Sequence, residues 1–182
     1  MNDFIWIQLA FFVALVAVLG LIPPIPFLFG VPITAQTLGV MLAGLILGPK
    51  LGALAMLLFI ALVLLGLPLL SGGRGGLGVL AGPTVGFFLA WPIAAAFTGW
   101  IAHRLSHLPI TLSSGLGAAI GGIGVVYAGG ILGLYGVAKL SIPQASLAVL
   151  VFIPGDALKV VIAAFLTAAV FRTLPHQVRS RQ

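Results

Sequence analysis

Two opposite charges lie close together in a chain that carries almost no charge. Asp156 and Lys159 are three positions apart in a long apolar run, so on a helix they share one face. In a membrane protein, an ionised side chain at the bilayer centre costs about 2.5–3.5 kcal/mol, so such residues usually face a cavity or a partner. We therefore predict a polar ligand site here. An ion pair that only fixes helix packing is the alternative, and the spacing leaves both interpretations open.

A further cationic group lies in a glycine-rich loop. Arg74 is flanked by Gly72, Gly73, Gly75 and Gly76, and glycine lets the backbone approach a ligand closely. The planar fork of a guanidinium group suits a carboxylate or a carbonyl. Gly73 and Arg74 are therefore candidate ligand-binding residues, with a flexible, solvated loop as the alternative.

Three polar residues near expected helix starts are further candidates for substrate binding. Thr34 and Gln36 stand at the start of the second apolar segment, where they can bond a ligand or the backbone freed by Pro32. Thr84 follows a Gly-Pro pair. Proline suits the first position of a helix, so this pair predicts a turn that leads into a helix. The sequence does not separate ligand binding from backbone capping at Thr34 and Gln36.

The elements that position these residues must be membrane helices. Charged residues make up 5% of the 182 residues, hydrophobic residues make up 62%, and the mean hydropathy is +1.32, which excludes an ordinary water-soluble domain. No ionisable side chain occurs from Phe4 to Pro49 or from Gly75 to Ala102. The apolar runs are continuous and do not alternate with polar residues, so helices are favoured over a barrel. The chain is predicted to be an all-α integral membrane protein.

The number of spans follows from the need for about 20 apolar residues in each. We predict one transmembrane domain over residues 1–182, with six helices over about residues 4–22, 34–48, 51–70, 83–103, 116–138 and 144–172. With a cytoplasmic N-terminus, the inner basic residues are Lys50, Arg104, Arg172, Arg179 and Arg181, and the outer ones are Arg74 and Lys139. The positive-inside rule therefore favours cytoplasmic N- and C-termini.

Small residues spaced four apart predict close helix contacts in the bilayer. One pair, Ala10 and Ala14, lies on the first helix, and similar glycine pairs lie on the fifth. Internal packing is the default interpretation of such spacing. Docking of Ala10 and Ala14 onto a second membrane protein is the more specific hypothesis.

Several functions are not supported by the residues present. Asp3 and Asp156 are the two acids of the chain, so an intramembrane enzyme lacks the usual acid and base groups. His103 and His107 have helical metal-ligand spacing, but no third ligand is in view and the chain has no cysteine. No long basic run indicates nucleic-acid binding. No phosphate-binding loop is present, so partner subunits must hydrolyse any ATP. We predict no cofactor and no metal.

The order and spacing of several short motifs resemble the BioY family, the biotin-binding S components of energy-coupling factor (ECF) vitamin transporters. The motifs are Gly30-Val31-Pro32-Ile33-Thr34-Ala35-Gln36-Thr37, Leu47-Gly48-Pro49-Lys50-Leu51-Gly52, Gly66-Leu67-Pro68, Gly72-Gly73-Arg74-Gly75-Gly76, Gly82-Pro83-Thr84 and Pro154-Gly155-Asp156-Ala157-Leu158-Lys159. The resemblance covers about residues 26–169.

This resemblance implies a six-helix S component in a bacterial cell (inner) membrane, with a biotin pocket near the outer leaflet. It also implies that the first helix docks through Ala10 and Ala14 onto a transmembrane coupling subunit, whose partner ATPase subunits supply energy. Arg74, Asp156 and Lys159 match polar positions of the family and are implied to be pocket ligands. The departures are Val85-Gly86-Phe87 where Gly-Gly-Tyr is expected, Phe59 where tyrosine is common, and Gly133 where an aromatic is frequent.

The chemistry of biotin suits these residues. Asp156 can accept a hydrogen bond from a ureido N–H, and Arg74 or Lys159 can meet the ureido oxygen or the valerate carboxylate. The sequence leaves open which cation meets which group. Candidates for the apolar wall are Tyr127, Phe87 and Trp91. An S component for another vitamin, thiamine or riboflavin, and a stand-alone small-molecule transporter are the alternative functions.

Overall fold

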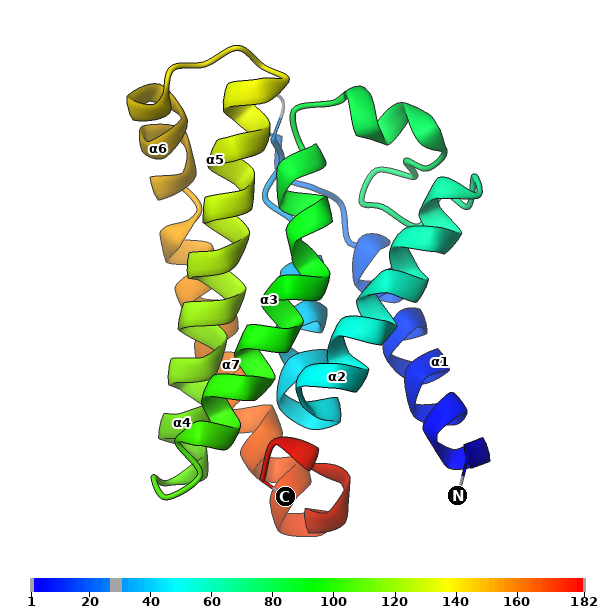
Figure 1. Cartoon of the computed structure of the whole chain (residues 1–182), viewed down its shortest axis with the longest axis vertical. Coiled ribbons are helices and arrows are strands. Elements are labelled where there is room, and N and C mark those ends of the chain that lie inside the picture. The colour runs from blue at the N-terminus through cyan, green and yellow to red at the C-terminus, as the bar shows by residue number, and fades with distance from the viewer. Residues whose placement is uncertain (1, 27–30, 182) are drawn as a thin grey trace.

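The protein is a bundle of apolar helices (Figure 1). A computed structural model describes residues 2–26 and 31–181. The α-helices are α1 (Asn2–Gly20), α2 (Gln36–Leu64), α3 (Val85–Arg104), α4 (Ile110–Gly117), α5 (Val126–Gly136), α6 (Ile142–Leu150) and α7 (Ile153–Thr173). The other helical segments are the 3₁₀ helices η2 (Leu77–Ala81), η4 (Pro175–Gln177) and η5 (Arg179–Arg181) and the π-helix η3 (Ala118–Val125).

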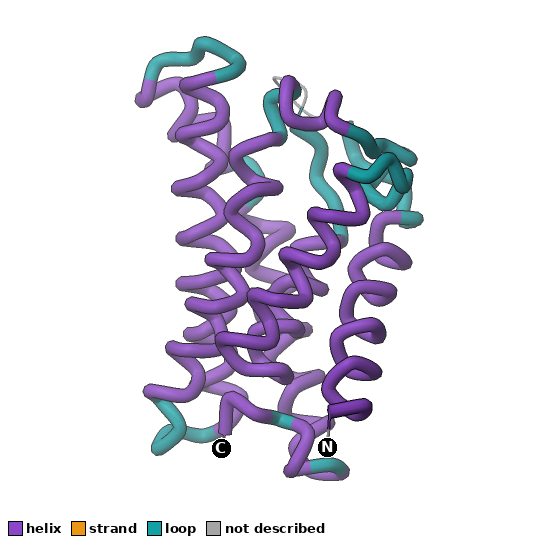
Figure 2. Tube along the Cα trace, turned by 45° about the vertical axis from the view of Figure 1, so that its right-hand side comes forward, coloured by secondary structure: helices purple, strands orange, loops and turns teal. Residues whose placement is uncertain are grey.

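Five continuous helical segments among the described residues are long and apolar enough to cross a membrane. They are Asp3–Gly20, Gln36–Leu64, Val85–Arg104, Ile110–Gly136 and Ile153–Thr173. The fourth segment joins α4, η3 and α5 end to end. Helix covers nearly all of the tube in Figure 2, and loops are confined mainly to the two ends of the bundle.

Helix α2 reverses direction at its middle. Gly48 has a φ of 78° and a ψ of 178°, outside the helical region, and Pro49 follows it. A positive φ of this size favours glycine, because a side chain there would be strained. A Cβ built on Gly52 would lie 2.9 Å from the carbonyl oxygen of Ala43, so the two arms of α2 pack backbone against backbone. The bundle therefore has five or six apolar helices, depending on whether the arms of α2 are counted separately.

Glycines allow α3 and α5 to approach each other just as closely. A Cβ built on Gly86 would lie 2.1 Å from the carbonyl oxygen of Gly129 and 2.7 Å from the Cα of Gly133. Gly133 stands where an aromatic was expected from the resemblance, and no side chain fits there beside Gly86. The small residues on this helix therefore serve packing within the bundle.

The region predicted as one helix over residues 144–172 contains a break. Helix α6 ends at Leu150 and α7 begins at Ile153, with Pro154 in its first turn. Proline is tolerated at this position because the first N–H groups of a helix have no intrahelical acceptor. As a consequence, Asp156 lies in the first turn of α7, where the helix dipole favours a carboxylate.

The C-terminal segment, which contains η4 and η5, closes one end of the bundle. Pro49 has no N–H to offer the carbonyl oxygen of Leu45, and the buried Ser180 hydroxyl donates a hydrogen bond to that oxygen. Gln177 accepts a hydrogen bond from the Gln8 amide of α1 at 2.6 Å. The segment thus supplies a donor that the reversal of α2 lacks.

We expect the substitution Ser180→Ala to lower the free energy of unfolding by about 1 kcal/mol, because the Leu45 carbonyl would be left buried without a donor. Thermal unfolding of the detergent-purified protein measures this loss. The exposed Ser106, substituted by alanine, is the matched control and should have no effect. Equal stability of both variants would contradict the assigned role of Ser180.

Candidate functional site

A pocket opens between the helices in the half of the bundle opposite to the C-terminal segment. The space between its walls, with the open solvent at its mouth included, is about 620 Å³. Its polar lining residues are Thr34, Gln36, Thr37, Arg74, Thr84, Tyr127, Asp156 and Lys159. Its apolar lining residues are Val31, Pro32, Ile33, Leu70, Phe87, Phe88, Trp91, Val126 and Phe152. The structure therefore gathers seven of the eight residues predicted to bind substrate, and Gly73 is the one outside the lining.

The ammonium group of Lys159 has three hydrogen-bond acceptors in the protein. Its Nζ lies 2.7 Å from Oδ1 of Asp156, 3.0 Å from Oγ1 of Thr37 and 2.5 Å from the carbonyl oxygen of Thr34. An ammonium group has three N–H donors, so all of them are occupied. Lys159 therefore ties α7 to the start of α2.

Asp156 is the centre of the polar cluster. Its side chain is buried, and its second carboxylate oxygen, Oδ2, accepts a hydrogen bond from the Tyr127 hydroxyl at 2.8 Å. The Thr37 hydroxyl lies 3.4 Å from Oδ1 and donates to it. Asp156 and Lys159 form an ion pair, so the cluster is electrically neutral. The carboxylate retains lone pairs that can accept from a ligand.

Arg74 differs from Lys159 in its surroundings. Its side chain is exposed at the pocket mouth, where Nε donates to the carbonyl oxygen of Ser71 at 3.3 Å and Nη1 donates to the Thr84 hydroxyl at 3.4 Å. Its Nη2 makes no hydrogen bond to the described residues. No carboxylate pairs with it there, so Arg74 is the cation available to an anionic ligand.

The turn that carries Arg74 depends on glycine. Gly72, Gly73 and Gly76 have φ values of 81°, 70° and 79°, a region that side-chain-bearing residues rarely adopt. Gly73 therefore shapes the loop that carries Arg74, and its contact with substrate stays a prediction.

Gln36 bonds protein backbone, which is one of the two roles expected for it, and Thr34 takes part through its own backbone carbonyl. The Gln36 amide nitrogen donates to the carbonyl oxygens of Val16 and Leu69, each at 3.1 Å, and its oxygen accepts from the backbone N–H of Ser71 at 3.0 Å. This residue is 1% exposed, and its side chain forms hydrogen bonds to backbone groups although it borders the pocket. Thr34 contributes its backbone carbonyl to Lys159.

Eight lining residues were not among the sequence candidates, and Thr37 and Phe152 are two of them. Thr37 accepts from Lys159 and donates to Asp156. Its position could have indicated this role, because it is the third polar residue, after Thr34 and Gln36, in an otherwise apolar stretch. Phe152 lies four positions before Asp156 and contributes to the aromatic wall. Residues four apart share a face of a helix, so the spacing of Phe152 and Asp156 could have predicted that both line the pocket. The Pro-Gly pair between them made a continuous helix over these residues hard to assume.

Aromatic rings form the apolar flank of the pocket. The Phe152 ring lies 6.0 Å from that of Phe87 and 6.4 Å from that of Tyr127, centre to centre. The Trp91 ring lies 5.6 Å from that of Phe88. An apolar ring system of a ligand can pack here while its polar edge faces the Asp156 cluster.

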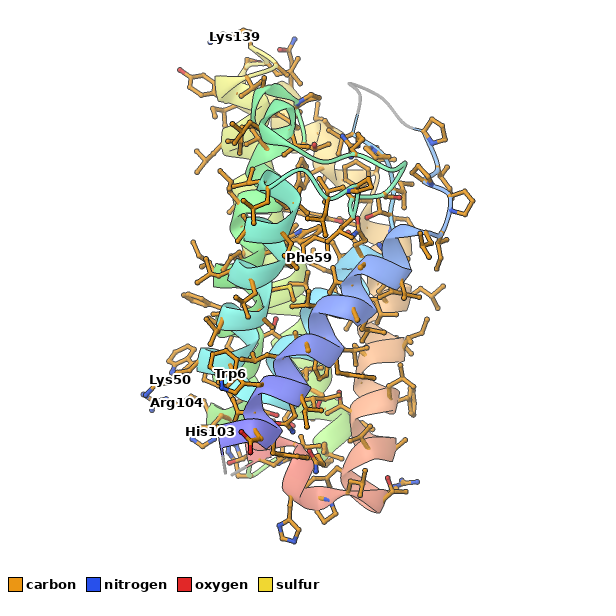
Figure 3. All side chains as sticks on the ribbon, turned by 90° about the vertical axis from the view of Figure 1, so that its right-hand side faces the viewer. Trp6, Lys50, Phe59, His103, Arg104 and Lys139 are labelled. Atoms are coloured by element: carbon orange, nitrogen blue, oxygen red, sulfur yellow. The ribbon has the colours of Figure 1, made fainter. Side chains whose placement is uncertain are left out.

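The predicted docking residues lie away from the pocket. Helix α1 packs against α2 at one side of the bundle, and Ala10 and Ala14 are both exposed. Trp6, Ile7 and Phe11 on the same helix are 61%, 64% and 61% exposed. In Figure 3 this helix faces the viewer along its length.

Comparisons with known proteins find similarity to a single family. The model of the BioY family matches residues 2–176. A protein of Rhodobacter capsulatus named biotin transporter BioY is 48% identical over 179 residues, with 93% of this chain and 94% of that protein covered. One of the same name from Rhizobium etli is 49% identical over 172 residues, with 91% and 92% covered.

The fold of a solved protein is also similar. The crystal structure of the S component for biotin from an ECF-type ABC transporter superposes with a TM-score of 0.91 at 29% sequence identity. The match covers 98% of this chain and 97% of that chain.

Proposed function

The chain belongs to the BioY family, and on this premise we propose that it is the biotin-binding membrane subunit of a biotin uptake system. It is a transporter component and not an enzyme. The observation that carries the proposal is the pocket itself. It combines an aromatic flank, a buried neutral cluster around Asp156, and Arg74 at its mouth, which pairs with no carboxylate among the described residues. Biotin has an apolar thioether ring, a ureido group and a carboxylate, and each of these has a matching surface.

The hydrogen bonds support one orientation of biotin. The carboxylate of the ligand pairs with Arg74, since the three N–H groups of Lys159 already have acceptors and its charge is balanced by Asp156. The ureido N–H groups donate to Asp156 at the inner end. Lys159 then acts by orienting Asp156 and holding α7 against the start of α2.

We further propose six transmembrane helices, with the arms of α2 counted separately, and cytoplasmic N- and C-termini. This topology is supported by the placement of the described ends of the chain at the same end of the bundle (Figures 1 and 2). Lys50, His103 and Arg104 lie toward that end, and Lys139 lies at the other (Figure 3). The pocket then opens to the outside of a bacterial inner membrane.

The proposed partners are an ECF transmembrane coupling subunit and its ATPase subunits. The support for them is the fold shared with an ECF S component and the exposed face of α1 around Ala10 and Ala14. The lipid bilayer covers the remaining apolar surface.

Equilibrium titration of the purified protein with biotin, thiamine and riboflavin tests the function. We expect saturable binding of biotin and none of the other two vitamins. Binding of thiamine or riboflavin in place of biotin would overturn the proposal.

The same titration tests the orientation. Arg74→Gln should weaken biotin about tenfold, because a charged hydrogen bond is lost, and should barely affect biotin methyl ester. Arg104→Gln, at the other end of the bundle, is the matched control. An equal loss for the acid and the ester would place the carboxylate elsewhere.

A further inference from the structure

One residue of the pocket wall carries a buried donor that has no acceptor in the described part of the chain. The indole nitrogen of Trp91, Nε1, makes no hydrogen bond within residues 2–26 and 31–181, and the residue is only 5% exposed. Buried N–H groups in proteins almost always have a partner, so an exception calls for an explanation. The explanation must account for a residue that lines the ligand pocket.

The two aromatic rings that pack against Trp91 offer no acceptor. The ring packs between Phe59 and Phe88, with centre-to-centre distances of 5.7 Å and 5.6 Å. Phenylalanine side chains have no lone pair that can accept from an indole N–H. The indole is therefore held in place by apolar contacts while its polar atom is unsatisfied.

Three donors near Asp156 already have acceptors among the described residues. Lys159 donates to three groups, and the hydroxyls of Tyr127 and Thr37 both donate to Asp156. The donors of Lys159, Tyr127 and Thr37 are thus occupied, whereas Asp156 can still accept hydrogen bonds from a ligand. A ligand carbonyl oxygen at this end needs a donor other than these three groups.

The depth of Trp91 matches the ring end of the proposed ligand. Thr84, which bonds Arg74 at the mouth, precedes α3, and Trp91 lies seven residues further along the chain. At a rise of 1.5 Å per residue this separation is about 10 Å along the helix. That distance is comparable with the length of an extended biotin molecule, from its carboxylate to its ureido oxygen.

We propose that the Trp91 indole N–H donates a hydrogen bond to the ureido oxygen of bound biotin, which makes Trp91 a specificity-determining residue. The inference rests on the proposed function. The pocket then bonds both the donors and the acceptor of the ureido group, because Asp156 accepts from its N–H groups and Trp91 donates to its oxygen. A ligand without this oxygen leaves the Trp91 N–H without an acceptor.

Two binding measurements test the inference. Trp91→Phe keeps an aromatic ring and removes the N–H, and we expect it to weaken biotin about tenfold. 2-Iminobiotin, which carries a protonated imino group in place of the oxygen, should lose almost nothing on the same substitution. Trp100→Phe, an exposed tryptophan on the same helix, is the matched control and should leave the affinity unchanged. Unchanged biotin affinity, or equal losses for both ligands, would overturn the inference.

A spectroscopic readout separates hydrogen bonding from packing. Trp6 and Trp100 are exposed on the outer surface, so the variant Trp6→Phe with Trp100→Phe leaves Trp91 as its single tryptophan. The ultraviolet resonance Raman band that reports hydrogen bonding at the indole nitrogen should shift when biotin is added. A band that does not move would refute the inference even if Trp91→Phe weakens binding.

The two levels of the proposal fail in different ways. A parent protein that binds no biotin overturns the proposed function, and the assignment of Trp91 with it. A parent that binds biotin with no shift of the Trp91 band overturns only the assignment.

Discussion

The substitution Asp156→Asn should weaken biotin binding by about 2 kcal/mol or more, which is roughly thirtyfold. Asp156 accepts from Lys159 and Tyr127 in the free protein, and from the ureido N–H groups in the proposed complex. An asparagine keeps the shape but turns one acceptor into a donor, which then faces another donor. It also leaves the Lys159 ammonium without a counter-charge.

Equilibrium binding in detergent measures this loss, and thermal unfolding of the same samples reports on the fold. Asp3→Asn is the matched control, because Asp3 is the other acid of the chain and is exposed at the start of α1. Lys159→Met should weaken binding by a similar amount, since it leaves the Asp156 charge unpaired.

The double variant distinguishes a binding site from an ion pair that only supports the fold. Asp156→Asn combined with Lys159→Met should recover thermal stability relative to the single variants, because neither charge is left buried alone. Biotin binding should stay weak, because the acceptor for the ureido group is still missing. A double variant that binds as tightly as the parent would show that the pair serves only the scaffold.

Substitution of both Ala10 and Ala14 by leucine should abolish assembly with the coupling subunit while biotin binding is retained. Both alanines are exposed on α1, and the Asp156 cluster is built from α2, α5 and α7. Leucine side chains at these positions would keep a partner helix from approaching the backbone of α1. Co-purification of the two membrane subunits measures assembly.

The control for this experiment replaces exposed alanines on other helices. Ala128→Leu with Ala169→Leu adds the same apolar volume to α5 and α7, and it should leave assembly intact. If the Ala10 and Ala14 variant loses stability and biotin binding together, these residues support the fold of the bundle and the docking hypothesis is wrong.

Much of the architecture was predictable because its causes are local or compositional. A chain with so few charges has to lie in a membrane, and this prediction is confirmed by the family and by the five long apolar helical segments. The reversal of α2 follows from Gly48, which tolerates a positive φ, and from Pro49, which has no N–H for the helical hydrogen bonds. The pairing of Asp156 with Lys159 follows from helical spacing, since positions three apart share a face.

The partners of these residues are instead set by contacts between distant segments. Lys159 bonds the carbonyl of Thr34, which is 125 positions away, and Ser180 bonds the carbonyl of Leu45 across 135 positions. No periodicity in the sequence encodes which helix lies opposite which. Trp91 gave no signal as a donor, because the absence of an acceptor is visible only once its neighbours are placed.

Gln36 and Thr37 show why the sequence could not assign every pocket residue. They are adjacent on α2, yet Gln36 bonds the backbone of α1 at Val16 and Thr37 bonds Asp156 and Lys159. In a soluble helix, an apolar stripe fixes which face turns inward. In a membrane helix the lipid is as apolar as the core, so this pattern is absent and the rotation of the helix is not encoded locally. The sequence by itself therefore determined the membrane class and the local geometry of the charged pair, whereas helix rotation and every long-range partner were decided by packing.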